Sequence, residues 1–394
     1  MKKKIMLIVP MLHQGGFERI CVMTARLLEP FYDVVLVVFS LEDIAFDVTG
    51  ITVIDLKLGA RKSKIFKIYN VLRRGYALRQ LQKKLKIDIS YSFGMTANIA
   101  NAFSRNDLLK LAACHSFEEI KRHGYMKLIG KHCDSVFCCS KKMADMVQKI
   151  YGFSNVFPLW NPCDIEGILD QSEKSEIEED FFSTPDRILV SMGREDDVKG
   201  FWHLLKCFRK IWEKRKDVRL MIVGDGDFTE YKEFAKELEI ENKVWFTGLK
   251  INPFPYLKRC DLYLLTSLSE GLPNALVEAL ALSLPIVSVN CKSGPAEILH
   301  EDWKGAEEKK QIFFADYGVL APELSWEKKL EVEWRDNRIV LEESEEKFAE
   351  AVLQVLFDEK LYEKYAQTGL DRAKDFSKEA YIMALIDHIE ERLS

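Results

Sequence analysis

Short apolar runs alternate with helix-forming stretches along most of this 394-residue chain, and the alternation limits the folds open to it. Such runs are typical of buried parallel strands, and amphipathic stretches between them are typical of helices that cover a sheet. The strands expected in the first half are Ile5–Pro10, Val34–Phe39, Val53–Leu56, Ile89–Phe93, Leu109–Cys114, Val136–Cys139 and Val156–Leu159. This order predicts a doubly wound α/β sheet.

The alternation is interrupted once, which predicts a domain boundary. Residues 166–186 have the polar, acidic composition of a linker and end in Ser-Thr-Pro-Asp. Expected strands then resume at Ile188–Met192, Arg219–Val223, Val244–Thr247, Leu262–Thr266, Ile286–Val289 and Gly318–Leu320. Because the chain is too long for one ordinary core, we expect two Rossmann-like domains, residues 1–165 and 187–375, followed by an amphipathic helix within residues 376–394.

Several simpler classes of protein are disfavoured. The first residues imitate a signal peptide, but Pro10 interrupts a short apolar run, which favours a first β-strand. No apolar run reaches the roughly 18 residues of a transmembrane helix. Cys133, Cys138 and Cys139 lie near His132, so a metal site is one interpretation and small core residues are the other. Nine scattered cysteines fit a reducing, cytoplasmic setting.

One segment combines two carboxylates with a helix start. Glu270 follows an expected strand, and Glu278 lies on the helix predicted over Asn274–Leu282, with Pro273 at its start. The free N–H groups of a helix N-terminus bind anions, and carboxylates accept hydrogen bonds from hydroxyls. A nucleotide-sugar needs both kinds of partner.

The segment resembles the E-x7-E motif of retaining glycosyltransferases of family 4, which have the GT-B fold. The resemblance extends to Gly294-Pro295-Ala296-Glu297-Ile298, to Gly193-Arg194 with Lys199-Gly200, and to Gly15-Gly16-Phe17-Glu18-Arg19. It implies two Rossmann-like domains that face a cleft, with the C-terminal helix crossing back to the first domain. It also implies a cytoplasmic enzyme of bacterial surface or capsular polysaccharide assembly.

The resemblance assigns roles to particular residues. Arg194 and Lys199 would grip the donor diphosphate, Glu278 the ribose hydroxyls, and Glu270 the donor sugar. His115 would contact the sugar from the first domain, with a structural histidine as the alternative. The remaining residues expected to bind the nucleotide-sugar are Gly15, Gly16, Gly193, Gly248, Gly271, Leu272, Pro273 and Asn274.

No metal or other cofactor is expected. Transfer leaves a diphosphate of growing negative charge, which Arg194, Lys199 and a helix end could stabilise without a metal. Asp225-Gly226-Asp227 has metal-ligand spacing but reads as a tight turn. The family implies retention of configuration by a front-face route, in which the leaving phosphate helps to deprotonate the acceptor hydroxyl. The donor expected from the resemblance is a UDP-sugar.

The charge distribution bears on partners. Residues 1–165 hold 25 Lys and Arg against 14 Asp and Glu, although the whole chain has a net charge of −5. The stretch Lys57–Lys86 contains eleven of these cations and no acid. Tyr69, Leu72 and Tyr76 recur at helical spacing within it. A basic amphipathic helix can lie on an anionic membrane, which suits a polyprenyl-diphosphate-linked glycan as acceptor at the inner membrane face. The alternative is a helix whose apolar stripe packs on the sheet.

Two other functions stay open. One is a nucleotide-sugar epimerase on the same fold, and the other is a non-catalytic GT-B subunit of a partner enzyme. A dehydrogenase is disfavoured because no expected strand runs into Gly-x-Gly-x-x-Gly, and nucleic acid is a poor partner for an acidic chain.

Overall fold

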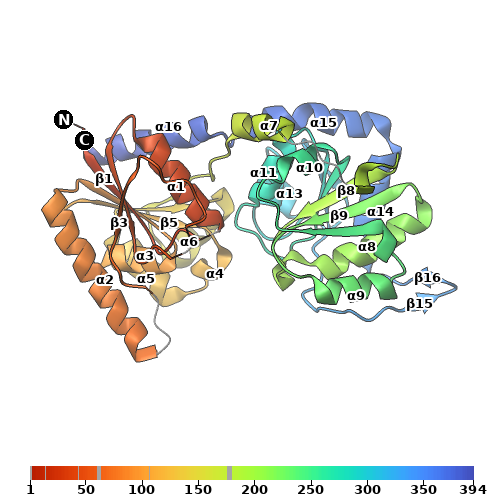
Figure 1. The fold of residues 1–394 in the computed structure, drawn as a ribbon, viewed down its shortest axis with the longest axis horizontal. Helices are drawn as coiled ribbons and strands as arrows, with labels where there is room; N and C mark the ends of the chain where they lie inside the picture. Colours follow the sequence, from red (N-terminus) through yellow and green to blue (C-terminus); the bar gives the residue numbers. More distant parts are fainter. Residues whose placement is uncertain (1, 14, 43, 60–63, 106, 175–179) are drawn as a thin grey trace. The chain divides into compact units, whose positions relative to one another are not determined.

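The computed structural model divides the chain into two compact units, Met1–Pro162 with Lys378–Ser394 (unit 1) and Cys163–Ser377 (unit 2) (Figure 1). It describes residues 2–13, 15–42, 44–59, 64–105, 107–174 and 180–394. Parts of two sequence predictions, residues 60–63 of the basic stretch and 175–179 of the linker, lie outside these ranges. Each unit is built on its own seven-stranded sheet.

Unit 1 contains a fully parallel sheet in the order β3-β2-β1-β4-β5-β6-β7. Its strands are β1 (Lys4–Val9), β2 (Asp33–Val38), β3 (Thr52–Asp55), β4 (Ile89–Phe93), β5 (Leu109–Cys114), β6 (Ser135–Cys138) and β7 (Val156–Pro158). Its helices are α1 (Gly16–Leu28), α2 (Lys64–Leu85), α3 (Met95–Ala102), α4 (Phe117–Ile120), α5 (His123–His132), α6 (Lys141–Tyr151) and α16 (Lys378–Leu393).

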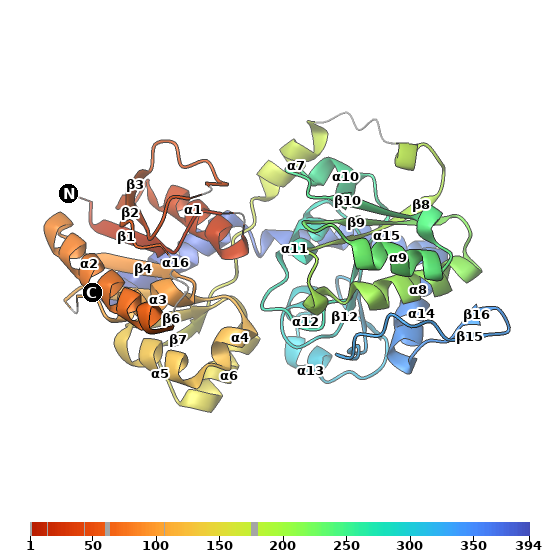
Figure 2. The ribbon, with the colours of Figure 1, turned by 60° about the horizontal axis from the view of Figure 1, so that its bottom comes forward.

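Both faces of this sheet are covered by helices (Figure 2). Along β1, Ile5 and Leu7 belong to one apolar cluster and Met6 and Ile8 to another, as the two-residue period of a strand requires. The first cluster includes side chains of α1 and of the C-terminal helix α16, and the second includes Leu78 of α2. Burial on both faces explains why the strands read as continuous apolar runs.

Unit 2 contains a second sheet, in the order β10-β9-β8-β11-β12-β14-β13. Its strands are β8 (Arg187–Met192), β9 (Val218–Val223), β10 (Val244–Gly248), β11 (Leu262–Leu265), β12 (Ile286–Val289), β13 (Phe313–Phe314) and β14 (Val319–Ala321), of which β13 alone among the described strands of this sheet runs antiparallel. A separate hairpin pairs β15 (Trp334–Arg335) with β16 (Arg338–Ile339).

Helices surround this second sheet. They are α7 (Ile165–Glu173), α8 (Phe201–Lys214), α9 (Thr229–Glu237), α10 (Phe254–Lys258), α11 (Asn274–Ala281), α12 (Pro295–Leu299), α13 (Trp303–Glu307), α14 (Glu343–Phe357) and α15 (Glu359–Lys374), with short 3-10 helices η1 (Asp180–Phe182), η2 (Asp197–Lys199) and η3 (Glu241–Lys243). The predicted α/β class with two Rossmann-like sheets is therefore confirmed.

One detail differs from the sequence expectation, and another agrees with it. Residues expected to begin a linker form α7, because Ile165 and Ile168 are buried when this helix packs beside α10 and α11. At the other end, α16 belongs to unit 1, where the Tyr381 hydroxyl lies 2.8 Å from that of Thr24.

Candidate functional site

Glu270 and Glu278 lie on one short segment of unit 2. Glu270 lies on the loop between β11 and α11, and Glu278 lies on the second turn of α11. The first turn of α11 carries no acidic side chain, and the N-terminal end of a helix presents a partial positive charge. Glu278 is buried on an otherwise apolar helix, where a carboxylate requires polar partners. This segment can therefore hold an anion and accept hydrogen bonds from hydroxyls.

A second loop brings a cation to the first. Lys199 ends η2 and its Nζ lies 2.7 Å from Oε1 of Glu270. The Thr266 hydroxyl donates to the Lys199 carbonyl at 3.0 Å, and the Leu268 amide donates to the Val198 carbonyl at 2.7 Å. Because β8 and β11 are neighbours in the sheet, the loops that follow them meet. The ion pair is thus fixed through the backbone as well as the side chains.

Glycines allow this close approach. At Gly193 an added Cβ would lie 3.1 Å from the Lys199 side chain, so the lysine stem lies across this residue. Gly200 has φ of +63°, and its Cβ would lie 2.4 Å from the Thr266 carbonyl oxygen. Gly224, which the sequence analysis missed, is tighter still, since its Cβ would lie 1.8 Å from the Gly193 carbonyl oxygen. Its position directly after β9 was the available signal.

Arg194 is not joined to the Lys199–Glu270 pair. Its side chain is 73% exposed, and its ion-pair partner is Asp196, at 3.6 Å. A guanidinium in this position is free to turn toward a bound anion at little cost, because exposed ion pairs contribute little stability.

The turn before α11 is supported by the loop after β12. The Ser293 hydroxyl donates to the Gly271 carbonyl at 2.8 Å. Gly294, at φ +86°, lies so close to Pro273 that an added Cβ would be 2.4 Å from the proline ring. Leu272 is buried and Asn274 begins the helix. These contacts support Gly271 to Asn274, of which all but Pro273 carry a backbone N–H.

A buried tyrosine beneath the site also escaped the sequence analysis. Tyr263 lies in β11, and its hydroxyl lies 3.2 Å from the amide nitrogen and 3.3 Å from the carbonyl oxygen of Met192. Burial raises the pKa of Tyr263 well above its ordinary value, and the nearby Glu278 and Glu270 charges raise it further. Nothing in the apolar sequence of this strand indicates that the Tyr263 hydroxyl lies within hydrogen-bonding distance of the Met192 backbone.

Gly248 ends β10 with φ of +68°, a conformation that favours glycine. An added Cβ would meet no atom within 4 Å, so the glycine faces open space. Its carbonyl accepts from the Gly224 amide at 3.2 Å, which links it to the loop beside Gly193.

In unit 1, the predicted residues gather at the carboxyl ends of β1 and β5. Gly15 and Gly16 begin α1, and at Gly15 an added Cβ would collide with the Glu18 carboxylate. Phe17 stacks on the His115 ring at a centroid distance of 6.4 Å, and Phe93 stacks on it at 6.1 Å.

The His115 ring is neutral at physiological pH. Burial lowers its pKa to about 4, against a smaller raising effect of Asn161. Neither ring nitrogen has a well-directed hydrogen bond to the described residues. A neutral imidazole offers one donor and one acceptor. Both ring nitrogens are buried in the structure, which is as consistent with the structural histidine that was the alternative as with a ligand contact.

Glu119 holds the backbone of this histidine, a role that the sequence did not suggest. Its Oε1 accepts from the His115 amide at 3.2 Å, and its Oε2 accepts from the Tyr125 hydroxyl at 2.7 Å. Burial raises the pKa of Glu119, while the hydrogen bonds from Tyr125 and His115 lower it.

Neither metal ligands nor membrane spans emerge from the described residues. No group of three or more His, Cys, Asp or Glu side chains there could hold a metal ion. Asp227 accepts from the Thr229 amide at 2.7 Å, so it serves the turn before α9. Cys133, Cys138 and Cys139 are buried, and burial raises the pKa of Cys133 to about 12. No described helix is long and apolar enough to cross a bilayer.

Comparison with known proteins relates this chain to glycosyltransferases. Residues 172–310 match the sequence profile of a family described as Glycosyl transferases group 1. An uncharacterized glycosyltransferase of Methanocaldococcus jannaschii is 36% identical over 197 residues, which cover 50% of this chain and 47% of that relative. The chain is 23% identical over 397 residues to N-acetylgalactosamine-N,N'-diacetylbacillosaminyl-diphospho-undecaprenol 4-alpha-N-acetylgalactosaminyltransferase of Campylobacter jejuni, covering 95% of this chain and 96% of the relative.

Solved structures give the same fold. Anabaena HepE, in a complex with UDP and glucose, superposes with a TM-score of 0.72 over 98% of this chain and 99% of its own, at 16% identity. Sucrose-phosphate synthase of Thermosynechococcus elongatus gives a TM-score of 0.75 over 100% and 99% of the two chains, at 13% identity. The expected GT-B fold is confirmed, and the matches together support a GT-B glycosyltransferase.

Proposed function

We propose that the chain is a retaining, metal-independent glycosyltransferase that moves a sugar from a UDP-sugar to a hydroxyl of a glycan acceptor. The observation that carries this proposal is the Lys199–Glu270 pair, at 2.7 Å, whose Glu270 lies on the loop that leads into the N-terminal end of α11. The nearby buried Glu278 supplies the acceptor for ribose hydroxyls. Few ligands besides a nucleotide-sugar need an anion site and two carboxylates together.

Each group has a defined task in this reaction. Lys199, the α11 amides and Arg194 after it turns inward would stabilise the diphosphate as the glycosidic bond breaks, because fixed charges act most strongly where charge develops. Glu270 is already ion-paired with Lys199, which suits an acceptor of sugar hydrogen bonds better than a nucleophile. A front-face route needs no enzyme nucleophile, since the leaving phosphate takes the acceptor proton, and configuration is retained.

Nucleotide binding is the first test. Thermal-shift measurements with UDP, GDP, UDP-glucose and UDP-N-acetylglucosamine should show stabilisation by the uracil ligands, by about 2.7 kcal/mol at a hundredfold excess over Kd. Stabilisation by GDP alone would overturn the UDP assignment. No response to any nucleotide would overturn the enzyme assignment and favour a non-catalytic subunit.

Product analysis is the second test. Incubation of a UDP-sugar with a polyprenyl-diphosphate-linked glycan should give a new product whose anomeric proton coupling matches that of the donor sugar. An inverted linkage would contradict retention. Conversion of the nucleotide-sugar in the absence of acceptor would favour an epimerase.

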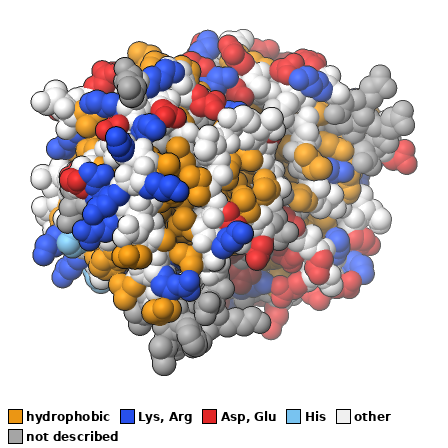
Figure 3. Space-filling view, turned by 60° about the vertical axis from the view of Figure 1, so that its left-hand side comes forward, with side chains coloured by type: hydrophobic (Ala, Val, Ile, Leu, Met, Phe, Trp, Pro, Cys, Tyr) orange, Lys and Arg blue, Asp and Glu red, His pale blue; other side chains and the backbone are white. Residues whose placement is uncertain are grey.

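A lipid-linked acceptor is supported by a surface on α2, which we define as the side chains of Tyr69, Leu72 and Tyr76 with the neighbouring cations. These three side chains are 56%, 55% and 66% exposed. The side chains of α2 that pack on the sheet are different ones and include the buried Leu78. In Figure 3, Lys and Arg side chains lie beside hydrophobic ones on the face of unit 1 that carries α2.

The cations of α2 divide between the two faces. Arg74 is buried, donates to the Leu58 carbonyl and lies 4.3 Å over the Phe39 ring, so it belongs to the core. Arg79, Lys83 and Lys84 are exposed. The name of the Campylobacter relative includes a diphospho-undecaprenol-linked glycan, which supports an acceptor at a membrane surface. Each exposed cation near anionic lipid contributes roughly 1 kcal/mol.

Vesicle co-sedimentation tests this contact. Replacing Arg73, Arg79, Lys83 and Lys84 with Gln should release the protein from phosphatidylglycerol vesicles and leave UDP binding unchanged. Binding of the native chain should also weaken at high salt. The matched control replaces Lys309, Lys310, Lys360 and Lys364 on unit 2, all of them exposed, and should bind as the native chain does. Equal binding to anionic and neutral vesicles, or an equal loss in the control, would contradict the contact.

A further inference from the structure

Three ionisable side chains are buried together between α8 and α14. His203 and Glu345 are 0% exposed and Lys206 is 6% exposed. His203 Nδ1 lies 2.5 Å from Glu345 Oε1, its Nε2 lies 2.9 Å from the Ser325 carbonyl oxygen, and Lys206 Nζ lies 3.5 Å from Glu345. We call these three residues, with Ser325, the His203 cluster.

Hydrogen bonding fixes the protonation of the cluster. The Ser325 carbonyl and the Glu345 carboxylate both offer acceptor oxygens to the two ring nitrogens of His203. Burial raises the pKa of Glu345. The hydrogen bond from His203 and the positive charge of Lys206 lower it by a larger amount, so the net shift of this pKa is downward. Glu345 also accepts from the Glu342 amide at 2.9 Å. The carboxylate is therefore ionised and fully engaged.

A buried cluster of charged groups contributes little to the free energy of unfolding. Transferring charged groups from water into the protein interior costs about as much free energy as their mutual attraction contributes. Replacement by apolar residues of similar volume therefore often leaves a protein equally stable. The bond network instead specifies where each element lies. His203 lies on the first turn of α8, three residues after Gly200, whose φ is +63°. Because Lys199 lies two residues before α8, contacts that fix the first turn of this helix also fix the loop that carries Lys199.

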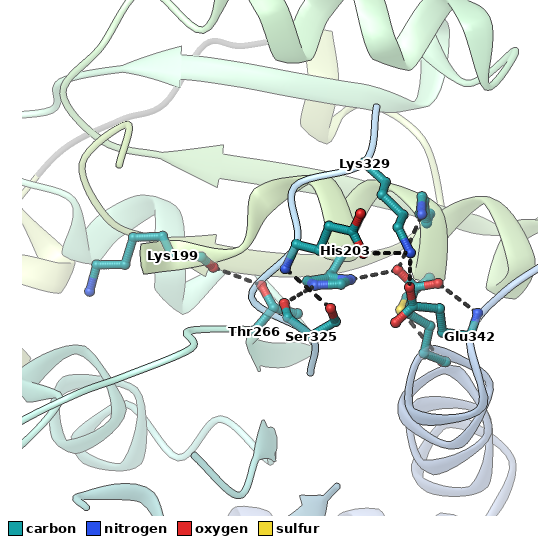
Figure 4. Close-up of polar contacts among 10 residues, drawn as sticks. Lys199, His203, Thr266, Ser325, Lys329 and Glu342 are labelled. Carbon is teal, nitrogen blue, oxygen red and sulfur yellow. Dashed lines mark hydrogen bonds and ion pairs between the residues drawn. The ribbon is translucent and has the colours of Figure 1, made fainter. Parts of the chain in front are cut away.

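The segment that contains Ser325 also contacts the loop that carries Lys199. Lys328 lies 2.9 Å from Asp197, in the same 3-10 helix as Lys199, and also pairs with Glu230 on α9. Lys329 lies 3.0 Å from Glu342, at the start of α14. Figure 4 shows His203 between Ser325 and the Glu342 end of α14, and Lys199, whose carbonyl accepts a hydrogen bond from the Thr266 hydroxyl.

We propose that the His203 cluster and Lys328 are positioning residues that hold Lys199 where it can meet the donor diphosphate. Neither His203 nor Lys328 would touch the nucleotide. The residues act on Lys199 through the first turn of α8 and through η2. This inference rests on the proposed nucleotide-sugar site, since it gives that site a support outside its own residues.

A double-mutant cycle in nucleotide binding tests the proposal. Calorimetric Kd values for UDP and for uridine, which lacks phosphates, are compared in the native chain and in Lys199→Gln, His203→Phe and the double variant. Lys199→Gln should weaken UDP by about 10- to 100-fold, the value of a hydrogen bond to a charged group. His203→Phe should weaken UDP several-fold, leave uridine unchanged and have no further effect in the Lys199→Gln background.

The outcomes separate a positioning role from a merely structural one. A His203→Phe loss that is additive with Lys199→Gln, or that affects uridine equally, would overturn the proposal. The matched control, Lys210→Gln, removes a 2.7 Å ion pair to Glu346 between the same two helices and should leave UDP binding unchanged. If His203→Phe does not fold, Lys328→Gln must show the same non-additive loss. Failure of the native chain to bind UDP would refute the proposed function instead.

Discussion

At the scale of single residues, the site combines a buried charged group with an exposed one. Glu278 is buried within an apolar helix, whereas Arg194 is largely exposed and paired only with Asp196 in the described contacts. Buried groups have fixed positions, and exposed groups can move to a ligand. The two residues should therefore respond differently to substitution.

Replacing Glu278 with Ala should weaken UDP binding by about 10-fold or more, because a carboxylate that accepts from ribose hydroxyls is lost. Replacing Arg194 or Lys199 with Ala should slow transfer by about 100-fold, as for other groups that stabilise developing charge. Calorimetry and initial rates measure the two effects. Glu363→Ala, an exposed carboxylate on α15, is the control and should change neither. Native turnover in all three site variants would contradict the assignment.

The low pKa of His115 predicts a dependence of stability on pH. In the unfolded chain this side chain takes up a proton near pH 6.5, as an ordinary histidine does, but the folded protein resists protonation until about pH 4. The contribution of His115 to the free energy of unfolding is therefore complete above pH 6.5. It falls as the pH is lowered toward 4, by at most about 3 kcal/mol.

Urea unfolding of the native chain and of His115→Asn measures this contribution. The difference between the two free energies of unfolding should depend on pH between about 6.5 and 4, with the variant losing less stability toward acid. Parallel pH profiles would show that the ring is not shielded as the structure indicates.

At the scale of helices and strands, glycines set how closely the loops of unit 2 meet. Gly224→Ala would place a Cβ 1.8 Å from the Gly193 carbonyl oxygen, where only backbone movement can relieve the clash. We expect a loss of about 3 kcal/mol or more in the free energy of unfolding and weaker UDP binding. Gly124→Ala on α5, where the added Cβ meets nothing within 4 Å, should be neutral or stabilising by up to about 1 kcal/mol. Thermal unfolding compares the pair, and equal stability of the two variants would contradict the packing described.

At the scale of the whole molecule, we assign stabilisation of the developing diphosphate charge to protein groups and not to a metal ion. Transfer should therefore survive excess EDTA, because Lys199, Arg194 and the α11 amides would supply the positive charge. Initial rates with and without chelator test this, and Asp225→Asn with Asp227→Asn should behave as the native chain does. Activity lost in EDTA and restored by Mg²⁺ or Mn²⁺ would reinstate Asp225 and Asp227 as metal ligands.

The sequence by itself determined the fold class and the identity of the main charged candidates. Parallel strands buried on both faces must be apolar throughout, so their order along the chain was readable without a structure. Glu270 and Glu278 were placed on a loop and its helix because a strand, a proline and a helical stretch follow one another directly. These are local properties, and the periods of strands and helices report them.

The tertiary structure alone decided which distant residues meet. Lys199 pairs with Glu270, 71 residues away, because β8 lies beside β11, and no periodicity specifies the order of strands. Likewise, α2 carries two apolar stripes, and only packing showed that Leu78 faces the sheet while Tyr69 remains exposed. His203 and Glu345 are 142 residues apart and look like ordinary polar residues on two helices. Their burial against each other depends on how α8 and α14 pack, which is a property of the folded unit and not of either segment.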